Sequence, residues 1–193
     1  MFAGIVIQLS ATADKTDGFF RDRTDRLLNV FAFFTVQSNL LLGITCLVAA
    51  LRPGVRSTVF RVARLCGVIG IAITGVVFHF ALRDLQDLTG QAKVADFLLH
   101  TASPILGVSG WLLFGPRRLI SKTIVWWTLA FPVAYGVFTL IRGEAVGWYP
   151  YPFMDVGEHG YPRIIVNCAI IGIAFVAFAT GAHALDRRLP GRR

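Results

Sequence analysis

Five apolar stretches, each close to the length that crosses a lipid bilayer, constrain the fold of this chain more than any other feature. They run approximately over residues 27–51, 62–82, 94–114, 123–141 and 164–185. A helix needs about 20 apolar residues to cross the hydrocarbon core, and only helices and closed barrels satisfy their backbone hydrogen bonds there. No alternation with a period of two is sustained. The sequence therefore predicts an all-α polytopic transmembrane helix bundle, with residues 1–193 forming one domain.

A shorter apolar segment covers residues 1–12. It is too short to span a bilayer, and no basic segment precedes it as in a secretory signal. We interpret it as the last part of a first span, which gives five full spans and one partial span in a six-span arrangement. The composition agrees: 55% of the residues are hydrophobic and 16% are charged, against roughly 25% charged in soluble domains. This excludes an ordinary soluble enzyme.

The charged residues fall into two sets, because successive connections alternate between the two sides of a membrane. One set holds eleven Lys or Arg against the single acid Asp186, a balance of +10: Arg52, Arg56, Arg61, Arg64, Arg117, Arg118, Lys122, Arg187, Arg188, Arg192 and Arg193. The other holds eight Lys or Arg against ten acids, including Asp84, a balance of −2. The positive-inside rule places the first set in the cytoplasm. We therefore predict an inner-membrane protein with a cytoplasmic C-terminus that contacts membrane lipids and does not bind nucleic acid.

Polar side chains at membrane depth are costly and are functional candidates by default. Six of them fall at a similar depth in the outer half of the bundle: Thr35, Ser38, Asn39, His79, Asp96 and His100. The first three share one helix face at spacings i, i+3 and i+4, and Asp96 lies one turn from His100. Pro104, four residues after His100, lacks the N–H for its carbonyl, which predicts a kink and a free acceptor. The shared depth predicts one outward-facing polar cavity.

Acyl transfer is one chemistry that fits these residues. A threonine hydroxyl becomes a nucleophile when a base takes its proton, and histidine titrates in the suitable range. Thr35 is then the candidate nucleophile and His100 the candidate base. Asp96 would orient the ring, and Asn39 or Ser38 would stabilise the oxyanion. This mechanism needs no metal or other cofactor, and its depth suits an amphipathic fatty acyl ester.

Two other functions remain open at this point. His79 and His100 are predicted on neighbouring antiparallel helices, as in bis-His haem or metal sites of helix bundles. A small transporter or membrane scaffold without enzymatic activity is the other alternative, although no inverted repeat is visible.

The connection before the last apolar stretch is rich in aromatic residues and proline. It contains Trp148, Tyr151, Phe153 and Asp155. Trp and Tyr favour the membrane–water interface, so an aromatic anchor is one interpretation. Because this connection lies on the same side as the polar residues, a lid over the predicted cavity is the other.

Three segments together resemble a bacterial six-span membrane family. They are Phe33-Phe34-Thr35-Val36-Gln37-Ser38-Asn39, His100-Thr101-x-x-Pro104 and Tyr151-Pro152-Phe153. That family is distantly similar to the androgen-induced membrane proteins, threonine hydrolases that cleave fatty acid esters of hydroxy fatty acids. The resemblance implies that Thr35 and His100 are the catalytic threonine and histidine.

Overall fold

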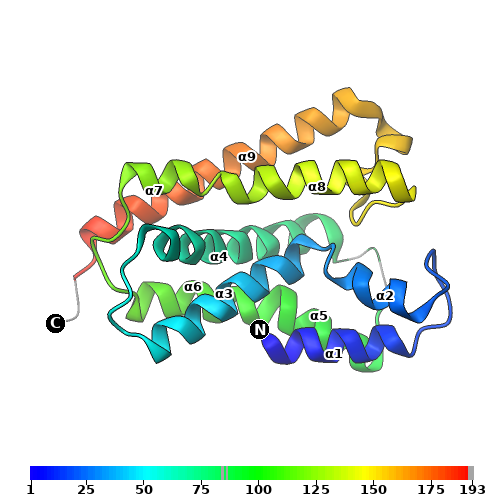
Figure 1. Cartoon of the computed structure of the whole chain (residues 1–193), viewed down its shortest axis with the longest axis horizontal. Coiled ribbons are helices and arrows are strands. Elements are labelled where there is room, and N and C mark those ends of the chain that lie inside the picture. Colours follow the sequence, from blue (N-terminus) through cyan, green and yellow to red (C-terminus); the bar gives the residue numbers. More distant parts are fainter. Residues whose placement is uncertain (84, 86, 191–193) are drawn as a thin grey trace.

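The chain is built from helices, and five helical segments are long and apolar enough to cross a membrane (Figure 1). This computed structural model describes residues 1–83, 85 and 87–190, and no strand occurs among them. The five segments are Phe34–Leu51, Thr58–Leu82, Gly90–Phe114, Lys122–Val146 and Val156–Arg188. The prediction of an all-α transmembrane bundle is therefore confirmed, and the protein is an integral membrane protein.

Several of these segments consist of more than one helix. The short N-terminal helix α1 (Phe2–Ala13) lies along α5 (Gly90–Phe97). The remaining α-helices are α2 (Arg23–Val30), α3 (Phe34–Leu51), α4 (Thr58–Val77), α6 (Ser103–Phe114), α7 (Lys122–Trp127), α8 (Ala130–Val146) and α9 (Val156–Arg188). Helix α9 is kinked at Gly160, whose φ of 69° and ψ of 157° interrupt the helix just before Pro162.

The stretch predicted over 27–51 is divided into α2 and α3 by a turn at residues 31–33. Two side chains satisfy carbonyls that the broken helix frees. Gln37 donates from Nε2 to the Phe31 carbonyl at 3.0 Å, and the Tyr135 hydroxyl donates to the Ala32 carbonyl at 3.0 Å. Thr35 consequently lies in the first turn of α3, and not inside a longer helix that begins near residue 27.

Helix α4 lies at the centre of the bundle and contacts α3, α6, α7 and α9. Its approach to α3 depends on glycine, as small residues let membrane helices pack closely. A Cβ atom on Gly67 would lie 2.9 Å from the backbone of Leu42, and one on Gly70 would lie 2.7 Å from Ser38 Oγ. Direct contact at these glycines therefore fixes how closely α3 approaches α4. It also fixes where the polar residues of α3 lie.

Two π-helical turns interrupt the regular helices, and each contains one histidine. The first, η1 (Phe78–Leu82), follows α4 and holds His79, and the second, η2 (Leu98–Ala102), joins α5 to α6 and holds His100. The Ser103 N–H closes the second turn by donating to the Leu98 carbonyl. Pro104 lies in the first turn of α6, where its missing N–H is tolerated. The irregularity predicted there is real, but it takes the form of a π turn.

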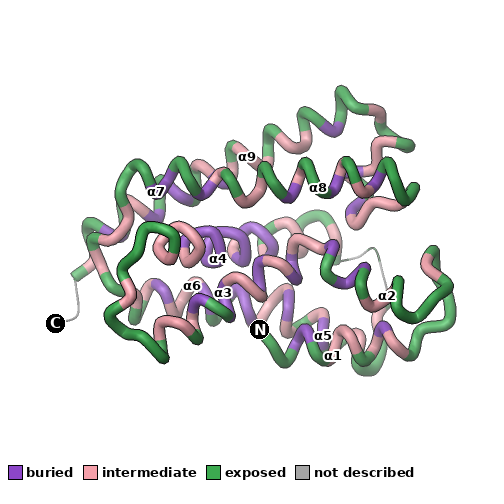
Figure 2. Tube along the Cα trace, viewed as in Figure 1, coloured by how far each residue is buried: buried purple, intermediate pink, exposed green. Residues whose placement is uncertain are grey.

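The connections alternate between the two ends of the bundle, as predicted (Figure 1). The α3–α4 and α6–α7 connections and the end of α9 lie at one end, and the α1–α2, α4–α5 and α8–α9 connections at the other. Among the predicted charges, Asp84, Arg192 and Arg193 lie outside the described residues. Large apolar side chains such as Val59, Phe80 and Ile173 are exposed, which suits contact with membrane lipid. Figure 2 shows that exposed positions recur along the helices of the bundle, α8 and α9 among them.

Candidate functional site

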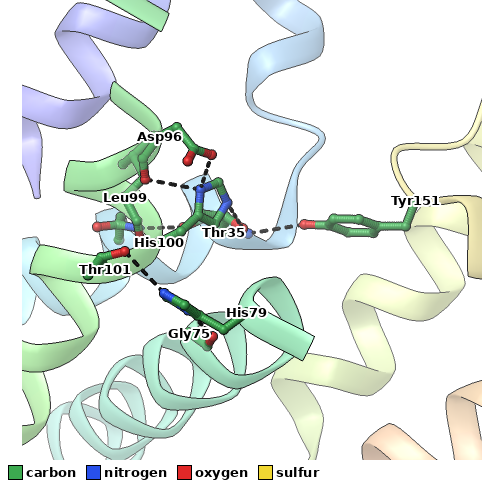
Figure 3. Close-up of polar contacts among 9 residues, drawn as sticks. Thr35, Gly75, His79, Asp96, Leu99, His100, Thr101 and Tyr151 are labelled. Carbon is green, nitrogen blue, oxygen red and sulfur yellow. Dashed lines mark hydrogen bonds and ion pairs between the residues drawn. The ribbon is translucent and has the colours of Figure 1, made fainter. Parts of the chain in front are cut away.

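Thr35 and His100, the predicted nucleophile and base, are in hydrogen-bond contact. Thr35 Oγ1 lies 3.2 Å from His100 Nε2, across the interface between α3 and η2 (Figure 3). Thr35 is buried, with 5% of its surface exposed, and the His100 side chain is 20% exposed. The distance is at the long end of hydrogen-bond reach, which is usual for a site without substrate.

Asp96 contacts the other ring nitrogen of His100. Its Oδ1 lies 2.9 Å from Nδ1, and its main-chain oxygen lies 3.2 Å from the same atom. A main-chain carbonyl only accepts hydrogen bonds, and so does an ionised carboxylate, so Nδ1 carries the proton of a neutral ring. Nε2 is then unprotonated and accepts from the Thr35 hydroxyl. Phe78 stacks on the imidazole with ring centroids 4.2 Å apart, which holds the ring plane.

Tyr151 reaches Thr35 from the α8–α9 connection. Its hydroxyl accepts a hydrogen bond from the Thr35 N–H at 3.4 Å (Figure 3). That N–H lies in the first turn of α3, where helical N–H groups have no partner within the helix. Burial raises the pKa of Tyr151 above its usual value, so the phenol keeps its own proton. The positive end of the α3 dipole and a neutral phenol therefore both lie beside the threonine.

Asn39 and Ser38 do not have the oxyanion-binding arrangement that the sequence suggested. Asn39 Nδ2 donates to the carbonyls of Thr35, at 2.9 Å, and Leu99, at 3.4 Å. Both of its protons are therefore used to join α3 to η2. Ser38 is fully buried against Gly70, and its Oγ has no hydrogen-bond partner among the described residues. Asn39 positions the two helices, and Ser38 fills the space left by the glycine.

His79, the other predicted histidine, forms its hydrogen bonds with residues other than Thr35 and His100. Its Nδ1 lies 2.8 Å from the Gly75 carbonyl and its Nε2 lies 3.4 Å from Thr101 Oγ1 (Figure 3). Both ring nitrogens of His79 therefore have hydrogen-bond partners, which a bis-His site would require this residue to give up at one nitrogen. Within the described part of the chain, no group of three or more His, Cys, Asp or Glu side chains is placed to hold a metal ion.

The four residues predicted to form a lid have different positions. Tyr151 and Phe153 line the cavity described below, with their rings stacked 5.2 Å apart. Trp148 packs edge-on against Phe20 and Phe33. The Asp155 side chain caps α9 by accepting from its first N–H groups.

An apolar cavity of about 280 Å³ begins at the threonine and histidine. It lies between α3, α4, α8 and the middle of α9, and residues of the short 3₁₀ turn η3 (Pro152–Met154) also line it. Besides Thr35, His100 and the two lid residues, its walls include Phe34, Val77, Val133, Leu140, Met154 and Ile171. Such a cavity accepts an apolar chain, and its few polar groups include the Thr35 hydroxyl and the His100 ring.

Sequence reasoning missed two features of this site. The hydrogen bond between Tyr151 and Thr35 joins residues 116 positions apart, and only the presence of a tyrosine in the predicted lid pointed to it. The second feature is the set of contacts of Arg142, one of the eight Lys or Arg residues of the second charged set. Arg142 donates to Asn29 Oδ1 at 2.8 Å and lies over the rings of Phe20 and Trp148, so it joins α2, α8 and both adjoining connections.

No family model, curated protein or solved structure matches the chain. Its function is therefore argued from the residues and geometry of the site.

Proposed function

We propose that the protein is an integral-membrane lipid-ester hydrolase in which Thr35 is the nucleophile and His100 the general base. The observation that carries this proposal is the continuous contact from Asp96 Oδ1 through His100 to Thr35 Oγ1, at 2.9 and 3.2 Å. A nucleophile, a base and a group that orients the base, in this order, are the elements of the Ser-His-Asp mechanism. The resemblance to threonine hydrolases of fatty acid esters points to the same two residues.

In the first half of the proposed reaction, Thr35 Oγ1 attacks the ester carbonyl carbon and its proton passes to His100 Nε2. The oxyanion that forms accepts a hydrogen bond from the Tyr151 hydroxyl. This hydroxyl accepts a hydrogen bond from the Thr35 N–H, so its own proton can be donated to the oxyanion. The carbon–oxygen bond to the alcohol then breaks, and the alkoxide takes the proton from His100. The products are a free alcohol and an acyl ester of Thr35.

In the second half, a water molecule loses a proton to His100 and attacks the acyl-threonine. The bond to Thr35 Oγ1 breaks, the threonine regains the proton, and a fatty acid leaves. Asp96 accepts from Nδ1 throughout and stabilises the ring when both nitrogens are protonated. The position of Thr35 at the positive end of α3 favours the developing negative charge.

The cavity supports a fatty acyl ester as the substrate class. Its walls are almost entirely apolar, and it opens between membrane-spanning helices. An acyl chain in this space leaves its carbonyl carbon at the end where Thr35 and His100 meet. The inner membrane, with the arginine-rich end of the bundle in the cytoplasm, is the proposed location, and fusions of a cytoplasmic or periplasmic reporter enzyme to the C-terminus test it.

The test is hydrolysis of a chromogenic fatty acyl ester by the full chain purified in a neutral detergent. We expect Thr35→Ala to reduce the rate to background and His100→Ala to reduce kcat by about 10²–10⁴-fold. Thr45→Ala is the matched control, because Thr45 is also buried on α3 but donates to the Leu42 carbonyl. Mass spectrometry of the quenched reaction should find the acyl group on the peptide that contains Thr35.

Equal rates in the parent and the Thr35→Ala variant, with no acylated peptide, would refute the proposal. That result would favour a transporter or a scaffold.

A further inference from the structure

A second cavity lies at the arginine-rich end of the bundle and shares no lining residue with the cavity beside the threonine and histidine. It lies between the α6–α7 connection and the last turns of α9, with a volume of about 520 Å³. Its lining residues are Arg118, Ile120, His183 and Arg187. Three of these four side chains are basic, which distinguishes this cavity from the apolar one.

The α6–α7 connection is held against α9 by three hydrogen bonds. The fully buried Asp186 accepts the Ile120 N–H at Oδ2, at 2.9 Å, and the Arg118 N–H at its main-chain oxygen, at 3.3 Å. His183 Nδ1 lies 2.6 Å from the Ile120 carbonyl. Because a carbonyl only accepts, Nδ1 carries a proton and Nε2 is the ring nitrogen left without a partner among the described residues. The wall of the cavity is therefore built by specific contacts.

Arg118 has a left-handed backbone conformation, with φ of 61°, and is the only non-glycine residue with positive φ in the described part of the chain. Such a conformation is unfavourable for a residue with a Cβ and persists where surrounding contacts impose it. Here the hydrogen bonds of Arg118 and Ile120 to Asp186 impose it. Its consequence is that the Arg118 side chain lines the cavity together with Arg187.

The neighbouring Arg117, in the same connection, differs from Arg118 because its guanidinium group has partners within the protein. Its guanidinium donates to the carbonyls of Trp111, at 3.1 Å, and Leu112, and it lies 5.2 Å above the Trp111 ring. The guanidinium groups of Arg118 and Arg187 have no comparable partner within the described residues. Asp186 forms no ion pair with either guanidinium group among the described residues, and its carboxylate is fully buried. Two like charges that face one cavity favour an anion between them.

We propose that this cavity binds a phosphate group through the guanidinium groups of Arg118 and Arg187, with His183 donating from Nε2 when its ring takes a second proton. Guanidinium groups bind phosphate oxygens with paired hydrogen bonds, and basic pockets at the ends of membrane helices take the phosphates of anionic lipids. The phosphate comes either from the headgroup of a membrane phospholipid or from a free phosphate ion. This site is separate from the hydrolase site and does not depend on its activity.

The experiment measures the thermal unfolding midpoint of the full chain in neutral detergent while one ligand is titrated. The first ligand is phosphatidylglycerol. The second is diacylglycerol with the same acyl chains, which is the matching lipid without phosphate. The third is sodium phosphate at constant ionic strength, which supplies phosphate without a lipid. The test variant is Arg118→Gln/Arg187→Gln. The charge-matched control is Arg52→Gln/Arg188→Gln, which changes two exposed arginines of the same end that do not line the cavity.

We expect phosphatidylglycerol, but not diacylglycerol, to raise the midpoint. At about 1 kcal/mol for each basic residue, the apparent affinity should fall roughly 30-fold in the test variant and less than twofold in the control. Arg118→Lys/Arg187→Lys keeps the charge but not the paired geometry, so its affinity should be intermediate. A shift with sodium phosphate that the test variant also loses identifies free phosphate as the source.

The proposal is overturned if neither phosphatidylglycerol nor sodium phosphate shifts the parent protein. It is equally overturned if the test and control variants lose the same affinity, because the effect is then the general charge of that end.

Discussion

The hydroxyl of Tyr151 is the group whose removal tests the proposed site most directly. Tyr151→Phe keeps the ring that packs on Phe153 and removes only the oxygen that accepts the Thr35 N–H. A buried N–H left without a partner costs about 1–3 kcal/mol. The bond is 3.4 Å long, at the weak end of the range, so we expect a loss of about 1 kcal/mol of unfolding free energy. In a chain of this length, that lowers the unfolding midpoint by about 2–4 °C.

The expected effect on catalysis is much larger than the effect on stability. Loss of one donor to a developing oxyanion lowers kcat by about 10²–10³-fold, whereas KM should change little because the cavity keeps its shape. The measurement is steady-state hydrolysis of the chromogenic fatty acyl ester, with the unfolding midpoint recorded on the same sample.

Tyr135→Phe is the matched control. Tyr135 is also a buried tyrosine that lines the same cavity, but its hydroxyl donates to the Ala32 carbonyl and not to Thr35. We expect a similar loss of stability and only a few-fold decrease in kcat. If Tyr151→Phe keeps kcat within threefold of the parent while Thr35→Ala is inactive, the oxyanion role of Tyr151 is wrong. Equal losses in both tyrosine variants would instead indicate general packing damage.

Three further predictions follow from the same contacts. Gly67→Ala places a Cβ against the α3 backbone and should lower the unfolding free energy by about 1–3 kcal/mol, whereas Gly181→Ala, with open space around it, should leave the midpoint nearly unchanged. Asp96→Asn should lower kcat by about 10²-fold, toward the lower end of the range for His100→Ala, because the main-chain oxygen of Asp96 still accepts from Nδ1. Burial raises the pKa of Tyr151, so its contribution to stability is complete below the usual tyrosine pKa of about 10 and is lost as pH rises through the higher folded pKa. The unfolding midpoint of Tyr151→Phe should therefore decrease less than that of the parent between about pH 9 and 11.

The spans and the polar pair could be predicted from the sequence because both depend on local spacing. Apolar stretches of bilayer length predict spans directly, and the four-residue spacing of Asp96 and His100 places them on one helix face. The contact between Thr35 and His100 follows from their similar predicted depth on separate spans. It is confirmed as a hydrogen-bond contact, while its catalytic role stays a proposal.

The features that the sequence did not predict depend on contacts between distant residues. A π turn forms when tertiary packing stabilises an i→i+5 bond, so its position around His100 is not visible as a local pattern. The extra residue changes which face the following side chains occupy. Ser103, the residue that follows this turn, is buried, and its Oγ has no hydrogen-bond partner among the described residues. The hydrogen bonds of Asn39 and Tyr151 were missed for the same reason.

The turn at residues 31–33, which interrupts a stretch predicted as continuous, is what gives Thr35 its chemical environment. In an unbroken helix the Thr35 N–H would bond to the Phe31 carbonyl four residues earlier. In the structure that carbonyl accepts from Gln37 Nε2, and the Thr35 N–H is free to meet the Tyr151 hydroxyl. The break also places the threonine at the positive end of α3, where a developing alkoxide is most favoured. The apolar pattern therefore sets the span, whereas a single polar side chain, Gln37, satisfies the carbonyl that the break leaves open beside the proposed nucleophile.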